Sequence, residues 1–107
     1  MKSEEARAID VLVLDAHGNA EEKGFWEDVR PNDKRHVLSL LALIGTEVSE
    51  AVEAVRRDDP ANFAEELADI CIRVFDVAGG MKISLGEEIE RKMEINAERP
   101  RKHGKTC

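Results

Sequence analysis

The sequence is poor in aromatic residues, in proline and in cysteine. Aromatic residues make up 4% of the 107 residues, tyrosine is absent, and there are only three prolines and two cysteines. With 42% hydrophobic and 36% charged residues, this composition favours amphipathic helices over a β-sandwich. The length suits one modest hydrophobic core, so we expect a single domain over residues 1–107.

The two cysteines support neither a zinc site nor a disulfide framework. Cys71 falls on an apolar helical stripe, Cys107 is the last residue, and no CxxC or Cys/His spacing occurs. The chain also lacks the basic start and apolar run of a signal peptide, and any apolar run long enough to span a membrane. We therefore expect reduced thiols in a cytoplasmic protein.

Basic charge is scarce outside the C-terminal end. The chain has 16 Lys and Arg against 23 Asp and Glu, a net charge of −7, and residues 99–107 form a basic tail without any acid. A surface that binds a nucleic-acid polymer needs a basic stripe, and the acidic body of this chain argues against one. A cation-loaded acidic pocket beside a basic tail would suit one small polyphosphate.

Apolar residues recur every three or four positions in four segments, which is typical of amphipathic helices. The third segment is expected to begin with Asp59 as its N-cap and Pro60 at its first helical position. Its buried stripe is expected to consist of Phe63, Leu67, Ile70, Val74 and Val77. The four expected helices cover residues 4–23, residues 34–57, the segment from Pro60 to the Gly79-Gly80 pair, and residues 85–98.

Turn and capping residues set these expected boundaries. Gly24 should end the first helix, and the Gly79-Gly80 pair should end the third. Ser84 and Glu87 have the spacing of a capping box at the start of the fourth helix. Short connections and the absence of a strand pattern predict an all-α fold, a four-helix up-and-down bundle.

Two acidic pairs, each with i, i+3 spacing, are the strongest functional signal. Glu47 and Glu50 lie in the second helix, and Glu66 and Asp69 lie in the third. Residues three apart share a helix face, so each pair directs two carboxylates to one spot, while Glu65 should face outward. Four converging carboxylates repel each other unless a cation neutralises them. Mg²⁺ is the natural candidate, with Mn²⁺ as a substitute.

A di-iron carboxylate bundle is the competing interpretation of these acids. Such sites use Glu-x-x-His pairs. Of the three histidines only His36, three residues after Asp33, comes near this pattern, and it lies next to a proline turn, away from both acidic pairs. All-oxygen ligation therefore favours Mg²⁺ or Mn²⁺ over iron.

The order ExxE, linker, ExxD resembles the all-α nucleoside-triphosphate pyrophosphohydrolases of the MazG-like superfamily, which includes relatives of the dCTP pyrophosphatases and dimeric dUTPases. The segment FAEELADI at 63–70, followed by Arg73 and Asp76, looks like the second metal helix of that superfamily. The ending KMEIN at 92–96 with HGK at 103–105 is similar to its basic C-terminal segment. The resemblance extends from about His17 to Lys105.

This resemblance implies that Glu47, Glu50, Glu66 and Asp69 bind Mg²⁺. We expect Glu47 and Glu50 to be the catalytic carboxylates. The sequence leaves open which carboxylate is the general base, and Glu47 is our choice. The resemblance also implies phosphate or nucleotide contacts by Lys92, Asn96 and Lys105. Arg73 has two open interpretations: contact with the polyphosphate, or an ion pair with Asp69 one turn away on the same helix.

His17 and Trp26 carry a narrower resemblance. Their nine-residue separation ahead of the ExxE helix looks like the base-binding His and Trp of dCTP pyrophosphatases, and Trp26 could stack on a nucleobase. The alternative is that Trp26 only covers the end of the bundle. The tryptophan that dCTP-specific members carry between ExxE and ExxD is absent here, which leaves a cytosine preference open.

Together these features predict Mg²⁺-dependent hydrolysis of a (deoxy)nucleoside triphosphate to the monophosphate and pyrophosphate, as in house-cleaning of the nucleotide pool. The alternatives are a phosphoribosyl-ATP or dinucleotide substrate, and a catalytically silent helical dimer that acts through protein contacts. We also expect a homodimer or homotetramer, because residues such as Leu38, Leu40 and Leu41 offer more apolar surface than one helical seam needs.

Overall fold

The computed structural model describes residues 2–100, which form four α-helices and no strand. The helices are α1 (Glu4–Glu22), α2 (Lys34–Arg56), α3 (Pro60–Gly80) and α4 (Leu85–Ala97). The all-α prediction with four helices is confirmed, and the helix bounds lie close to those expected. Within this described part, no helix has the length and apolar content needed to cross a membrane.

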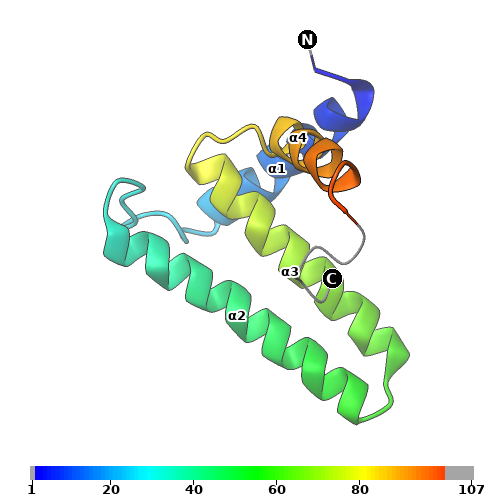
Figure 1. Cartoon of the computed structure of the whole chain (residues 1–107). Coiled ribbons are helices and arrows are strands. Elements are labelled where there is room, and N and C mark those ends of the chain that lie inside the picture. The colour runs from blue at the N-terminus through cyan, green and yellow to red at the C-terminus, as the bar shows by residue number, and fades with distance from the viewer. Residues whose placement is uncertain (1, 101–107) are drawn as a thin grey trace.

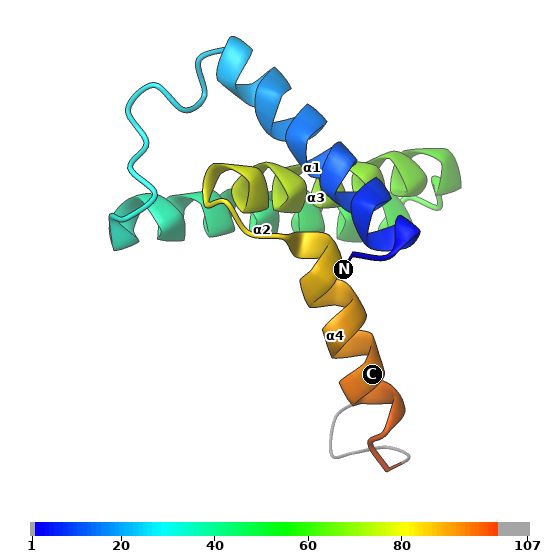
Figure 2. The same ribbon diagram turned by 90° about the horizontal axis from the view of Figure 1, so that it is seen from above.

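The long helices α2 and α3 lie side by side and antiparallel (Figure 1). α1 packs across α3, and α4 packs on α1 and points away from the α2–α3 pair (Figure 2). The extensive contacts are those of α2 with α3, of α1 with α3 and of α1 with α4. One chain therefore does not close into the expected up-and-down bundle, because the turn after α3 directs α4 onto α1 instead of along the α2–α3 pair.

Three helices are followed, two positions after their last residue, by a residue with a left-handed backbone conformation. These residues are Gly24 (φ 81°), Asp58 (φ 54°) and Lys82 (φ 58°), and after each of them the next N–H bonds to the carbonyl five positions back. The expectation for Gly24 is confirmed. The Gly79-Gly80 pair instead lies inside the last turn of α3, and Lys82 makes the reversal.

Side chains cap the starts of the first three helices. Ser3, Asp33 and Asp59 each accept a hydrogen bond from a backbone N–H of the first turn, as expected for Asp59. Ser84 makes no such bond, so the predicted capping box with Glu87 is wrong.

Asp10 of α1 caps the start of α4 in place of that box. Its Oδ1 accepts from the Gly86 N–H and its Oδ2 from the Ser84 hydroxyl, both at 2.9 Å. The Gly86 bond and then the Lys2 ammonium hold the pKa of Asp10 below its usual value. Gly86 allows this approach because a Cβ there would lie 2.2 Å from the Ala6 carbonyl oxygen.

The interior of a single chain is thin. Its buried hydrophobic residues are Val13 and five alanines, and no large side chain in the described part is completely buried. Leu67 of the expected α3 stripe is exposed, and the other four stripe residues are half-buried. Leu14 of α1 and Leu38 of α2 are 69% and 64% exposed. Much of the apolar helix surface predicted from the sequence is therefore not covered within one chain.

Candidate metal centre

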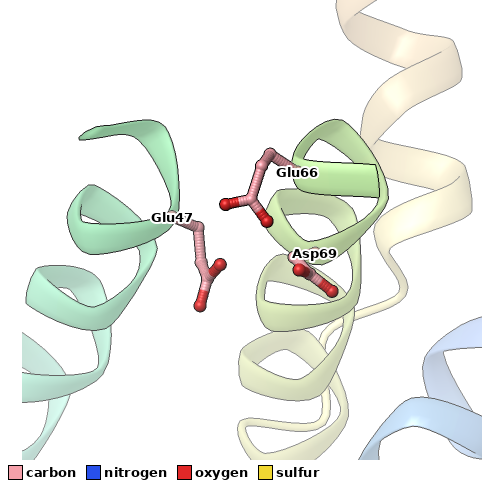
Figure 3. Close-up of side chains that lie close together, drawn as sticks. All are labelled: Glu47, Glu66 and Asp69. Atoms are coloured by element: carbon pink, nitrogen blue, oxygen red, sulfur yellow. The ribbon is translucent and has the colours of Figure 1, made fainter. Parts of the chain in front are cut away.

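Three carboxylates from two helices meet between α2 and α3. Glu47 comes from α2, Glu66 and Asp69 come from α3, and one oxygen of each lies within 4.8 Å of the others (Figure 3). The i, i+3 spacing on α3 places both of its acids on the face toward α2. We call these three residues the acidic cluster.

Two members of the acidic cluster are buried, since Glu47 is 8% and Glu66 is 7% exposed. Arg73 of α3 donates from Nε to Glu47 Oε1 at 3.0 Å, across the helix interface. Among the ion pairs of residues 2–100, none joins Arg73 to Asp69. The intrahelical pair considered from the sequence is therefore replaced by one that ties α3 to α2.

The pKa of Glu66 is raised from 4.5 to about 7. The largest cause is a hydrogen bond with Glu50, followed by burial and by a hydrogen bond with Asp69, and each of these favours the protonated acid. Glu50 itself is exposed and lies beside Glu66, outside the acidic cluster. The structure thus brings three of the four expected ligands together and sets the fourth next to them.

The donor set of this site fits a hard divalent cation. It consists of carboxylate oxygens, which Mg²⁺ and Mn²⁺ prefer, and Arg73 supplies only one positive charge against several acids. The raised pKa of Glu66 shows that its negative charge is disfavoured there, and a bound cation would relieve this. No histidine belongs to the acidic cluster in the described residues, so it lacks the imidazole ligands of a di-iron site.

Two hollows adjoin the acidic cluster. A narrow hollow of about 280 Å³ lies between α1 and the α2–α3 pair and is lined by Asn19, Lys23, Phe25, Asp69, Arg73 and Asp76, among others. A wider, open hollow of about 800 Å³ lies between α2 and α3 on the Glu50 side, with Glu53, Arg57, Asn62 and Glu65 on its walls. Glu65 is exposed there, as expected.

His17 and Trp26 lie together beside the narrow hollow. His17 Nδ1 lies 2.9 Å from Asp76 Oδ1, and Trp26 Nε1 donates to the same oxygen at 2.8 Å. The two rings meet edge to face with centroids 4.8 Å apart. The sequence placed Asp76 on the third helix but gave no sign of its partners, which lie 59 and 50 residues away along the chain.

Residues on the hollow's α1 wall were also missed. Asn19 lies in the last turn of α1 and Lys23 is the C-cap four residues later, so they share a face, and Phe25 follows in the loop. That shared face was the only available signal, because nothing in the sequence shows that it meets α3.

The remaining predicted substrate contacts lie elsewhere. Lys92 and Asn96 are exposed on α4, which packs on α1, and neither lines the two hollows. Lys105 lies outside the described residues. The acidic cluster of one chain is therefore not joined to the expected α4 contacts of the same chain.

Comparison with protein families gives one match. The model of the MazG nucleotide pyrophosphohydrolase domain matches residues 35–102, which include α2 except its first residue and all of α3 and α4. Comparisons with curated proteins and with solved structures gave no match.

Proposed function

The chain belongs to the MazG nucleotide pyrophosphohydrolase family, and on that premise we propose that it hydrolyses a nucleoside triphosphate, preferably a deoxynucleotide, to the monophosphate and pyrophosphate. The observation that carries this proposal is the meeting of three carboxylates from α2 and α3, two of them buried. Removal of non-standard or surplus nucleotides from the cellular pool is the role that such a reaction would serve.

Glu47, Glu66 and Asp69, with Glu50 beside them, would hold Mg²⁺. The bound cation would neutralise phosphate oxygens and ease deprotonation of the attacking water. Glu47 is our choice for the carboxylate that accepts the water proton. The hydrogen bond from Arg73 fixes the orientation of its side chain, as expected for a general base. The Arg73 side chain is 41% exposed and bonds to Glu47 through Nε, which leaves the end of its guanidinium for a phosphate oxygen.

A second copy of the chain would complete the site. Lys92 and Asn96 lie on α4, which points away from the α2–α3 pair of its own chain. The apolar residues of α2 and α3 stay exposed in one chain, which favours burial between copies. We therefore propose that α4 of one protomer supplies phosphate or nucleotide contacts to the acidic cluster of another, in a homodimer or homotetramer.

The test is an assay of pure protein against a panel of deoxynucleoside and nucleoside triphosphates with Mg²⁺, followed by chromatography of the products. We expect equal amounts of monophosphate and pyrophosphate from at least one nucleotide. Absence of both products with Mg²⁺ and with Mn²⁺ would refute the enzymatic function and favour the silent interaction module.

Two matched variants test whether the active site lies on the Glu66 face of α3. Glu66→Gln removes one charge from the acidic cluster at nearly constant volume, and we expect activity to fall by about a hundredfold or more, since even changes behind metal ligands cost 10–100-fold. Glu65→Gln makes the same change one residue away on an exposed side chain and should leave activity within about twofold. If Glu65→Gln were inactive and Glu66→Gln active, the assignment of the site to this face of α3 would be wrong.

A further inference from the structure

One carboxylate oxygen joins three separate segments of the chain. Asp76 Oδ1, on α3, accepts the Trp26 indole N–H at 2.8 Å and lies 2.9 Å from His17 Nδ1. Because a carboxylate oxygen only accepts, Nδ1 carries the proton in this pair. Both rings therefore have their polar edge directed to Asp76, although they come from α1 and from the loop after it.

The end of α3 is shaped to receive these two rings. A Cβ at Gly79 would lie 2.6 Å from the His17 Cβ, and one at Gly80 would lie 2.1 Å from the Trp26 ring. Both rings thus rest directly on the helix backbone. Gly79 and Gly80 serve close packing here, and the three segments are held as one unit with Asp76 at its centre.

This unit borders the narrow hollow beside the acidic cluster. Asp76 belongs to both, since it lines the hollow together with Arg73 and Asp69. Phe25, which also lines the hollow, directly precedes Trp26, so the position of Trp26 restricts the position of Phe25. The side of the hollow next to the acidic cluster is charged, since Glu47, Asp69 and Arg73 line it. The side formed by α1 and the loop after it combines the Phe25 ring and two alanines with Asn19 and Lys23, and this less charged side suits a base and sugar.

We propose that Asp76 is a positioning residue for the nucleoside half of the substrate: by holding His17 and Trp26 against the end of α3, it fixes the wall of the narrow hollow. This proposal rests on the proposed function, which places the phosphates at the acidic cluster. It separates two roles on α3, with Asp69 and Glu66 serving the phosphate end and Asp76 serving the nucleoside end.

The proposal predicts a selective loss of nucleoside recognition in Asp76→Ala. KM for the nucleotide should rise by about tenfold, the effect of losing a hydrogen bond to a charged group, while kcat changes by less than about threefold. Affinity for Mg²⁺-tripolyphosphate, which has no nucleoside, should stay within about twofold. Asp28→Asn, an exposed acid two residues after Trp26, is the control and should change neither quantity.

Trp26 is the only tryptophan, so its fluorescence reports directly on this unit. Asp76→Ala should shift its emission to longer wavelength and increase quenching by acrylamide, because the indole loses its partner. Asp76→Asn retains an oxygen at Oδ1 and should restore most of the emission and part of the affinity. Unchanged emission in Asp76→Ala, or equal weakening of nucleotide and tripolyphosphate, would overturn the proposal.

A variant that does not fold and a wild-type protein without activity can each be distinguished from failure of this proposal. If Asp76→Ala does not fold, Asp76→Asn and Trp26→Phe carry the same comparison, and equal weakening of the two ligands overturns the proposal there as well. If wild-type protein releases no pyrophosphate, the proposed function fails. Calorimetric binding of a non-hydrolysable nucleotide and of tripolyphosphate then still decides whether Asp76 serves the nucleoside end.

Discussion

Glu66 is the residue at which the electrostatic cost of the site is concentrated. It is 7% exposed, and hydrogen bonds with Glu50 and Asp69 work with burial to raise its pKa to about 7. In the unfolded chain the same side chain has a pKa near 4.5. A cation that replaces the proton would remove this cost, which links the occupancy of the site to the stability of the fold.

The metal-free protein should lose stability as the pH rises from about 5 to about 8. Between the unfolded and folded pKa values the native state binds more protons at Glu66 than the unfolded chain does, so the free energy of unfolding falls with rising pH. Thermal melts in a chelating buffer across this range would measure the effect. If the acidic cluster binds Mg²⁺ only in the native state, Mg²⁺ added at the upper end should raise the melting temperature.

Glu66→Gln is the control for this pH dependence, because its amide keeps the neutral form at every pH. Its melting temperature should vary less with pH, and at about pH 8 the metal-free variant should be as stable as wild type or more so. Mg²⁺ should stabilise it less. Parallel curves for the two proteins would show that another group controls the pH dependence.

At the scale of helices, two glycines of this fold differ in the space around them. Gly86 allows α4 to approach α1, where a Cβ would lie 2.2 Å from the Ala6 carbonyl oxygen. A Cβ at Gly18, in α1, would meet nothing within 4 Å. The first glycine is required by packing, whereas the second only weakens its helix, as its intrinsic propensity predicts.

The same substitution should therefore have opposite effects at these two positions. Gly86→Ala should lower the free energy of unfolding by about 1–3 kcal/mol, because the backbone of α1 must move to make room. Gly18→Ala should raise it by up to about 1 kcal/mol through helix propensity. Urea denaturation of both variants measures the difference. Destabilisation by Gly18→Ala would indicate that this face of α1 is covered in the assembled protein.

At the scale of the whole molecule, one chain leaves much of its apolar surface exposed. Its buried residues are mostly alanines, while large apolar side chains of α2, among them Leu38, Leu41, Val52 and Val55, remain about half exposed or more. The acidic cluster is also flanked by a hollow that is open to solvent. These properties are typical of a protomer whose core is finished by association.

We predict that light scattering at micromolar concentration gives a multiple of the 12.0 kDa chain mass. Replacing Leu38 and Leu41, which are 64% and 51% exposed, by serine should weaken association by removing apolar area from the interface. Activity should fall together with the molar mass if α4 of a second copy completes the site. A wild-type particle of 12.0 kDa, or full activity in a monomeric variant, would contradict this assembly.

Patterns among residues close together in the sequence were sufficient to predict the helices and the candidate metal ligands. The 3.6-residue period, Asp59 with Pro60, and Gly24 depend on neighbours within a few residues, so the helix bounds were predictable. The i, i+3 pairs put Glu66 and Asp69 on one face for the same reason.

Contacts between distant segments were not predictable, because no local spacing encodes them. Arg73 pairs with Glu47 on α2 instead of Asp69 on its own helix. Asp10 caps α4 across 74 residues, and Asp76 gathers His17 and Trp26. Periodicity tells which side chains share a face, but only the packing of helices decides which face meets which. That choice turned α4 away from the expected bundle and set Glu50 beside the acidic cluster instead of within it.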